Sequence, residues 1–246
     1  MLLSVIVPVL RFDSYTQFAL DSLVPALNGI DSEVIIVSTD DCNHLMSRYE
    51  NSGLFRFLTV NINTLTYKLN LAIDSAQGYY IARFDSDDLC EPERFKVQLD
   101  FLKVTEYDFC FGDARVINTE GDLIGRKVSD SSSLDFKCDL IHPTMMCYRS
   151  VILKLGGYAN IEYSEDYMLW LSAVSSGFSI GTINEPMISY RVHDSQMTSS
   201  NNLSPTFARN TSIKLYLLMK KFSFRLMGGF IYDFIKTFYA RFFSRL

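Results

Sequence analysis

The sequence predicts an α/β protein with a doubly wound sheet, mixed but mostly parallel, flanked by helices and followed by a C-terminal helical tail. Apolar runs of strand length alternate with amphipathic segments between positions 3 and 104. Strands separated by helices of about 10 to 15 residues imply parallel pairing and right-handed crossovers. Polar clusters follow two of the apolar runs, at residues 38–41 and 85–88. Because ligands bind beyond the carboxyl ends of strands in such sheets, both clusters are expected to line one cleft.

The N-terminal part of the chain supplies strands and helices in alternation. Ser14 and Gln17 have the spacing of a capping box, which predicts the start of a helix, and Asn28 with Gly29 predicts its end. Gly78 ends a second helix that has one apolar face. The expected strands are residues 3–9, 33–37, 55–60 and 79–85. The expected helices are residues 14–27, 66–77 and 92–104.

The pattern changes after residue 104, where strands and turns become denser. A hairpin is expected over residues 114–126, turning at residues 120–122. A short helix ends at Gly156, and an amphipathic helix over residues 165–176 is stopped by Gly177. The remaining expected strands are residues 107–111, 145–148, 180–183 and 187–192.

Composition and charge place the chain among folded globular proteins. It is 48% hydrophobic and 21% charged over 246 residues, a length that suits one large α/β domain or one domain with an appendage. The net charge of −5 is unevenly distributed: residues 213–246 hold seven basic residues and one acidic residue, a balance of +6, which leaves −11 for residues 1–212. An acidic body argues against nucleic acid as a partner. The basic, aromatic tail favours contact with a membrane surface.

Cysteine usage and hydropathy predict a cytoplasmic protein. Five cysteines are scattered without C-x-x-C spacing (positions 42, 90, 110, 138 and 147), which favours free thiols over disulfides or a zinc site. The N-terminus lacks the basic region of a signal peptide. No apolar stretch reaches the roughly 18 residues that a membrane span needs.

The acidic cluster at residues 85–88 (DSDD) is the strongest candidate for chemistry. In an extended backbone Asp85 and Asp87 share a face. Neighbouring carboxylates repel one another unless a cation or water lies between them, and oxygen ligands of this kind suit Mn²⁺ or Mg²⁺. An acidic turn that caps a helix beginning near Pro92 explains the cluster about equally well. Neither a G-x-G-x-x-G dinucleotide motif after the first strand nor a P-loop motif is present.

Six short segments occur together in an order that is specific even though each is weak alone. They are residues 4–8 (SVIVP), 85–88 (DSDD), 141–144 (IHPT), 156–158 (GGY), 165–170 (EDYMLW) and 190–193 (YRVH). Over residues 3–199 the chain resembles family 2 of the glycosyltransferases, which are inverting sugar-nucleotide enzymes of GT-A fold. The bacterial enzymes that build O-antigen and capsule polysaccharides are the most similar members. The resemblance implies transfer of a sugar from a nucleotide donor, of which a UDP-sugar is favoured, to a hydroxyl of a glycan, with lipid-linked glycans the favoured acceptors.

On the donor side, the resemblance implies a nucleotide-sugar site that includes Pro8 and the acidic cluster. Asp87 is expected to bind the metal directly, Asp85 to contact the ribose or a metal-bound water, and Asp88 to support them. His193 is expected on the metal or on the departing diphosphate, although a histidine in a loop can also make an ordinary hydrogen bond.

Two segments of the donor side depart from the family pattern. The family has Asp-Asp-Gly-Ser after the second strand, whereas this chain has residues 37–41 (VSTDD), and Asp40 is chosen as the base-contacting acid. The first departure puts the identity of the base in doubt. Lys68 replaces a common arginine and is expected to reach a phosphate as a point charge.

On the acceptor side, Asp166 resembles the family's general base, and Glu165 is expected to orient it or to touch the acceptor. The alternative is that both acids only favour the N-terminus of a helix. His142 has an acceptor-side or a structural role with equal weight. Trp170 could stack on a sugar but lies in an apolar helix face that usually packs in a core.

The expected boundary lies between a catalytic domain, residues 1–204, and the tail, residues 205–246. On a helical wheel from Phe230 onward, aromatic and aliphatic residues occupy one arc, with Asp233 and Lys236 on the other. This pattern favours an interfacial helix on anionic lipid at the inner face of the cytoplasmic membrane. The alternative is that the helix packs on the catalytic body or in a homodimer interface.

Two other functions remain open at this point. A sugar nucleotidyltransferase would share the architecture but needs a glycine-rich basic loop after the first strand, where this chain has residues 10–13 (LRFD). A non-catalytic protein that binds nucleotide sugars is compatible with the altered segment at residues 37–41.

Overall fold

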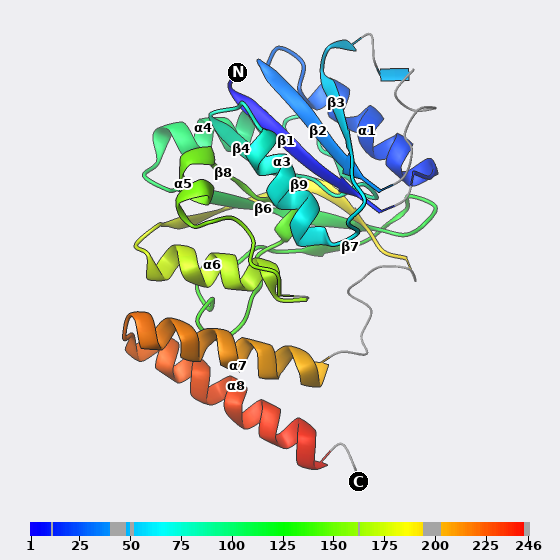
Figure 1. Ribbon diagram of the computed structural model, residues 1–246. Helices are drawn as coiled ribbons and strands as arrows, with labels where there is room; N and C mark the ends of the chain where they lie inside the picture. Colours follow the sequence, from blue (N-terminus) through cyan, green and yellow to red (C-terminus); the bar gives the residue numbers. More distant parts are fainter. Residues whose placement is uncertain (11, 40–47, 50–51, 162, 194–202, 244–246) are drawn as a thin grey trace.

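The computed structural model describes residues 1–10, 12–39, 48–49, 52–161, 163–193 and 203–243 (Figure 1). Their centre is one sheet of nine strands in the order β3-β2-β1-β4-β8-β6-β9-β5, with β7 paired to β6 outside this path. The pairs of β1 with β2, β1 with β4, β2 with β3 and β6 with β9 are parallel. The strands run as follows: β1 Leu3–Val9, β2 Ser32–Ser38, β3 Phe55–Thr59, β4 Tyr80–Arg83, β5 Leu89–Cys90, β6 Phe109–Ile117, β7 Leu123–Lys127, β8 Met146–Tyr148 and β9 Ile180–Arg191.

Helices cover both faces of the sheet, as the doubly wound prediction requires. They are α1 Ser14–Ala26, α3 Leu65–Ser75, α4 Arg94–Val104, the 3₁₀ turn η2 His142–Thr144, α5 Arg149–Lys154, α6 Glu165–Ser175, α7 Leu203–Lys220 and α8 Phe224–Phe243. Alternate residues of β1 point to opposite faces: Val5 and Val7 pack with α1 and α4 in one apolar core, and Ile6 packs with α3, α5 and α6 in the other. The predicted fold class is therefore confirmed.

Three local predictions were wrong. The first helix is capped by Asp13, whose Oδ1 accepts a hydrogen bond from the Thr16 backbone N–H at 3.0 Å, and not by Ser14. The two strands expected at residues 180–183 and 187–192 are one strand, β9, because a register shift opposite Asp113 accommodates Pro186 without ending the pairing. β6 also runs without a break from Phe109 to Ile117, so the strand expected over residues 107–111 and the first strand of the hairpin are one.

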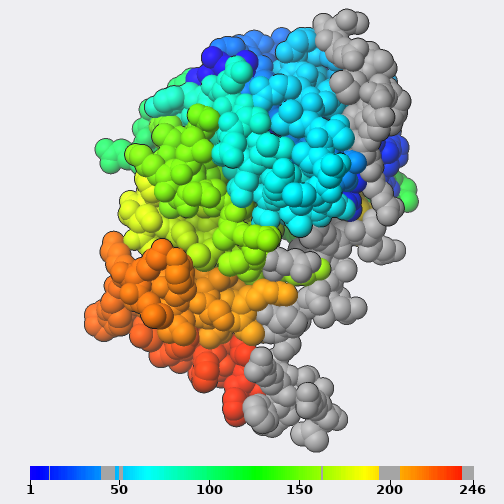
Figure 2. Space-filling model, in the orientation of Figure 1, coloured from blue at the N-terminus to red at the C-terminus, as the bar shows by residue number. Residues whose placement is uncertain are grey.

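The C-terminal residues form a helical hairpin, α7–α8, that extends the molecule beyond α6 (Figures 1 and 2). α7 lies against α6 with Ile213 and Leu217 buried, and α8 lies against α7. A buried ion pair joins the two tail helices: Lys214 Nζ lies 2.6 Å from Asp233 Oδ2, with side-chain exposures of 0% and 2%. The described tail thus packs on the catalytic body, which is the alternative that the sequence left open.

The adjacent glycines Gly228 and Gly229 do not interrupt α8, which runs through both. A Cβ at Gly229 would overlap the backbone carbonyl of Asp135, so a residue without a side chain lets the helix approach the loop that carries Asp135. The wheel also misplaced Asp233, which lies in the buried face of α8 and not among solvated residues. Within the described residues, no helix combines the length and the apolar character needed to cross a membrane.

Candidate active site

A cleft of about 1330 Å³ opens at the carboxyl ends of β1 and β4. β1 lies between β2 and β4, so the chain connections diverge at this point of the sheet, which is where doubly wound proteins bind ligands. Most predicted site residues line this cleft: Pro8, Lys68, Asp85, Asp87, His142, Glu165, Asp166 and His193. The structure therefore brings together groups that are up to 185 positions apart in the chain, although their individual roles stay predictions.

Asp85 is paired with Arg83, a residue that the sequence analysis did not single out. Arg83 Nη2 lies 2.6 Å from Asp85 Oδ1, and the Arg83 side chain is only 5% exposed. Burial raises the pKa of Asp85, and the positive charge of Arg83 opposes that rise. Nε and Nη1 of Arg83 are buried and have no hydrogen-bond partner in the described part of the chain. A charged residue closing the apolar run of β4, two positions before Asp85 and on its face, was the available signal.

Asp87 faces His193 across the cleft mouth. His193 Nε2 lies 2.9 Å from Asp87 Oδ2, and the histidine ring stacks on Tyr15 with centroids 5.7 Å apart. Arg191 fixes the turn behind them: its Nε donates to the Asp87 backbone carbonyl at 3.0 Å, and its guanidinium lies over Tyr15. The path of β9 therefore places His193 next to the acidic turn, although the two are more than 100 positions apart in the sequence.

Asp88 is fully buried behind the two other carboxylates. Its Oδ1 accepts a hydrogen bond from the Arg191 backbone N–H at 2.9 Å, whereas Oδ2 is buried and has no hydrogen-bond partner among the described residues. Burial, together with the charges of Asp85 and Asp87, raises the pKa of Asp88 well above its usual value. An anionic Asp88 would therefore require a nearby cation.

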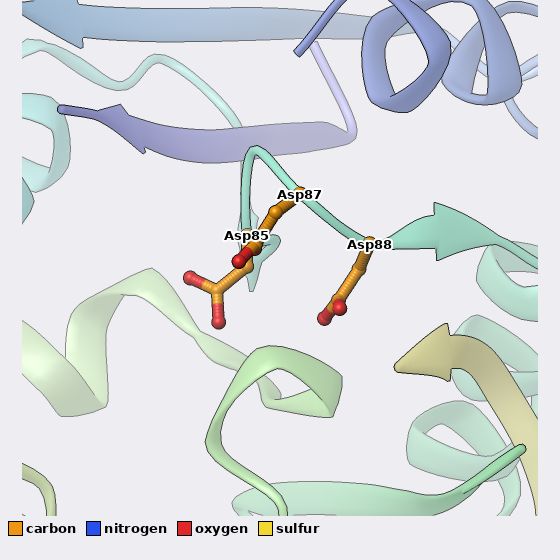
Figure 3. A group of neighbouring side chains, drawn as sticks. All are labelled: Asp85, Asp87 and Asp88. Carbon is orange, nitrogen blue, oxygen red and sulfur yellow. The ribbon is translucent and has the colours of Figure 1, made fainter. Parts of the chain in front are cut away.

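The three aspartates together could hold a divalent ion. Figure 3 shows their side chains on the turn between β4 and β5, and one oxygen from each lies within 4.8 Å of the others. Carboxylate oxygens suit Mn²⁺ or Mg²⁺, and Asp88 Oδ2, which no described residue hydrogen-bonds, would gain a partner in such a site. The donor set thus fits the predicted metal.

Asp166 also lines the cleft, at the first turn of α6. Its Oδ1 accepts a hydrogen bond from the Tyr167 backbone N–H at 2.7 Å, which leaves Oδ2 facing His142 Nδ1 at 4.0 Å. Burial raises the pKa of Asp166, opposed by the Tyr167 hydrogen bond and by Arg83. A raised pKa improves a carboxylate as a proton acceptor near neutral pH. Burial also raises the pKa of the neighbouring Glu165.

Two aromatic residues, Tyr158 and Trp170, fix the position of the His142 ring. Its Nε2 lies 2.8 Å from the Tyr158 hydroxyl, and its ring contacts Trp170 edge-on with centroids 5.7 Å apart. Burial, with a further contribution from Arg83, lowers the pKa of His142 well below its usual value, so the ring is neutral at neutral pH. Because Asp166 faces a neutral imidazole, no ion pair with His142 holds its pKa down.

Two predicted residues differ from expectation in their placement. Trp170 is fully buried between Phe109 and Phe111 and does not line the cleft, so the suggestion that it stacks on a sugar is wrong in this structure. Lys68 lines the cleft but is 3% exposed, and its Nζ donates to the Val9 carbonyl at 2.7 Å. Asp40 lies outside the described residues.

Comparison with known proteins identifies the family. Residues 4–154 match Glycosyl transferase family 2, so the chain belongs to this family. It is 27% identical to the O-antigen biosynthesis glycosyltransferase WbnJ of Escherichia coli, over 96% of each chain. It is also 26% identical to an Escherichia coli UDP-Gal:alpha-D-GlcNAc-diphosphoundecaprenol beta-1,3-galactosyltransferase, over 65% of this chain and 62% of that one. The protein is thus a glycosyltransferase whose relatives act in surface polysaccharide synthesis.

Solved structures confirm the GT-A fold. The chain superposes on Staphylococcus aureus TarS 1–349 in complex with UDP-GlcNAc with a TM-score of 0.71, at 18% identity, covering 89% of this chain and 67% of that one. It superposes on the mannosyltransferase PcManGT of Pyrobaculum calidifontis, in complex with GDP-Man and Mn²⁺, with a TM-score of 0.59 at 13% identity, covering 89% and 63% of the two chains.

Proposed function

We propose that this family 2 enzyme is an inverting, metal-dependent glycosyltransferase that moves a sugar from a UDP-sugar to a hydroxyl of a lipid-linked glycan. The observation that carries the proposal is the placement of the acidic turn, Asp85 to Asp88, and of Asp166 in the lining or wall of the same cleft. The acidic turn then offers ligands for a cation beside the diphosphate, and Asp166 offers a proton acceptor. Glycosyl transfer requires both.

The donor side is assigned to the end of β4 and the turn after it. Asp85, Asp87 and Asp88 would hold the metal, and His193 would lie beside the diphosphate through its contact with Asp87. A divalent metal bound there neutralises the charge that develops on the leaving diphosphate. Arg83, two of whose buried nitrogens have no hydrogen-bond partner in the part of the chain that the structure describes, keeps Asp85 oriented toward the cleft.

The acceptor side is assigned to Asp166. Its free Oδ2 takes the proton from the acceptor hydroxyl while the hydroxyl oxygen forms a bond to the anomeric carbon. The bond from that carbon to the diphosphate oxygen breaks on the opposite face, so the configuration inverts and the nucleoside diphosphate leaves. The neutral His142, fixed by Tyr158, limits where Asp166 Oδ2 can point.

The choice of donor and acceptor rests on the relatives. UDP-GlcNAc occupies a structural neighbour, and a relative is named for a UDP-Gal donor and a diphosphoundecaprenol acceptor. Asp40 remains the proposed contact to the base. Lys68 is proposed to act near the phosphates by holding the end of β1, since its ammonium group already binds the Val9 carbonyl.

Release of nucleoside diphosphate tests the proposal. UDP- and GDP-sugars are incubated with Mn²⁺, Mg²⁺ or EDTA, and we expect slow hydrolysis of a UDP-sugar that requires metal. Asp166→Asn should keep donor binding and lose at least about 100-fold in turnover, the usual contribution of a general base. Asp100→Asn, an exposed α4 residue paired with Lys103, is the matched control. Binding without turnover in every mixture would indicate a sensor, and a requirement for nucleoside triphosphate with release of pyrophosphate would indicate a nucleotidyltransferase.

We further propose that the enzyme works at the inner face of the cytoplasmic membrane, in contact with anionic lipid through α8. The helix turns a stripe of large apolar side chains away from the body: Ile231, Phe234, Ile235 and Phe238, each about half exposed. Lys236 lies over the Tyr232 ring at the edge of this stripe. An apolar stripe bordered by lysine suits the interface of an anionic bilayer.

Vesicle sedimentation tests this contact. We expect the protein to sediment with phosphatidylglycerol vesicles and to remain in solution with phosphatidylcholine vesicles. The double variant Phe234→Ser/Phe238→Ser should lose sedimentation, whereas Val104→Ser, which removes an even more exposed apolar side chain from α4, should not. Equal sedimentation of both variants would show that the stripe does not contact lipid.

A further inference from the structure

An apolar pocket of about 360 Å³ lies between α6 and α7, outside the cleft. Its walls are Ile161, Met168, Ala208, Arg209, Ser212, Ile213 and Tyr216. The volume falls within the range of small-molecule sites. Its walls offer few polar groups, so a sugar would lose hydrogen bonds with water and gain few in return. The lining therefore suits a hydrocarbon chain.

One cation, Arg209, stands in this apolar wall. Its Nη1 is buried and has no hydrogen-bond partner among the residues that the structure describes. A buried guanidinium donor without an acceptor costs free energy, which an anionic ligand would recover. An apolar pocket with a single unsatisfied arginine is complementary to an amphipathic anion.

Tyr163 connects the pocket to the cleft. The Arg209 guanidinium lies over the Tyr163 ring, 5.5 Å from its centroid, while Tyr163 itself lines the cleft. Tyr163 has a φ of 63°, a conformation that is costly for a residue with a side chain and that tends to occur at functional sites. Asp166 follows three positions later, after Ser164, whose hydroxyl donates to Asn210 Oδ1 at 3.1 Å. Arg209 thus lies next to the segment, residues 163–166, that contains the proposed base Asp166.

We infer that this pocket binds the lipid diphosphate end of the acceptor: the first part of an apolar chain packs between α6 and α7, and Arg209 binds the diphosphate. The glycan then extends past Tyr163 toward Asp166. This inference rests on the proposed function, because it assigns the acceptor's lipid to a place beside the same reaction site. It gives α7 a role in substrate binding.

Direct binding of farnesyl diphosphate tests the inference without any glycosyl transfer. Calorimetry compares farnesyl diphosphate with inorganic diphosphate, which carries the charge alone, and with farnesol, which carries the chain alone. We expect farnesyl diphosphate to bind at least about tenfold more tightly than either, since both halves of the site contribute. Arg209→Gln should weaken its binding about tenfold or more, as expected for loss of a hydrogen bond to a charged group. Ala208→Phe, which fills the pocket, should weaken it without changing the affinity for inorganic diphosphate.

Lys221→Gln is the matched control, because it removes one exposed positive charge just after α7 without touching the pocket. Thermal unfolding confirms that each variant is folded. Equal affinities in Arg209→Gln and Lys221→Gln, or no binding of farnesyl diphosphate to the wild type, would overturn the inference. Donor hydrolysis in the same samples separates the two proposals: intact hydrolysis without lipid binding removes only the pocket assignment, and lipid binding without hydrolysis removes only the proposed reaction.

Discussion

The adjacent glycines of α8 offer a sharp test of whether the tail is part of the catalytic body. A Cβ at Gly228 would lie 3.4 Å from Phe136 Cζ, an ordinary contact at the tip of a side chain. A Cβ at Gly229 would overlap the Asp135 carbonyl and lie 3.3 Å from Lys214 Nζ. Both alanine substitutions improve helix propensity equally, by about 0.8 to 1.0 kcal/mol. The difference in stability between the two variants therefore measures only the overlap of the new Cβ at position 229 with the Asp135 carbonyl.

Overpacking against a fixed neighbour costs about 1 to 3 kcal/mol. For a protein of this size, 1 kcal/mol shifts the melting temperature by about 2 to 4 °C. We therefore expect Gly228→Ala to melt about 2 to 12 °C above Gly229→Ala, and at or above the wild type. The residues after Asp135 line the cleft, so Gly229→Ala should also lower kcat/KM for donor hydrolysis. Differential scanning calorimetry and a nucleotide-release assay measure the two effects. Equal stabilisation of both variants would show that α8 does not dock on this loop.

Three further predictions follow from the buried charges. Asp233→Ala leaves Lys214 buried without its ion-pair partner, so we expect it to lower the free energy of unfolding, measured in urea, by about 3 to 5 kcal/mol. The double variant Lys214→Met/Asp233→Leu should recover most of this loss. Equal stability of the single and double variants would contradict the prediction. A general base must be deprotonated, and the pKa of Asp166 is raised, so kcat should fall as the pH drops through a pKa above the usual aspartate value near 4. A pH–rate profile that is flat down to about pH 4 would refute the assignment of Asp166 as the base. Asp88→Asn should weaken Mn²⁺ binding, measured by calorimetry, by more than about tenfold relative to Asp74→Asn on the exposed side of α3; unchanged affinity would exclude Asp88 as a ligand.

The sequence predicted the sheet and the cleft because both depend on local patterns. Apolar runs define the strands, and polar residues directly after them mark the carboxyl edge of the sheet, which is how Asp85 and Asp87 were found. The resemblance to the family pointed to Asp166 and His193. Both line the same cleft as the acidic turn although each is more than 75 positions from it in the chain, a proximity that no local pattern encodes. The pairing of Arg83 with Asp85 was accessible from strand alternation and was missed. Trp170 was ambiguous because an aromatic residue in an apolar helix face has the same pattern in a core and in a binding site.

The tail was the least predictable part, for a physical reason. A helical wheel ranks faces by hydropathy, so it assigns Asp233 to water. The structure buries Asp233 because Lys214, on the preceding helix, neutralises it, and pairing between helices is invisible to a pattern within one helix. Likewise, a pair of glycines usually predicts the end of a helix, but α8 continues through Gly228 and Gly229, and at Gly229 the helix lies close to the Asp135 carbonyl.

The loop around Asp135 places the tail and the reaction site in mechanical contact. Arg225 of α8 binds Asp135 Oδ2 at 3.2 Å, and Lys214 of α7 donates to the Phe136 carbonyl at 3.3 Å. The next residues of the same loop, Lys137 and Cys138, line the cleft. A displacement of α8 would therefore move the loop around Asp135 and, with it, the residues that line the cleft. If α8 contacts lipid as proposed, the membrane would position the outer stripe of α8 while the buried face of that helix supports the wall of the cleft, so that docking and active-site order would depend on one another.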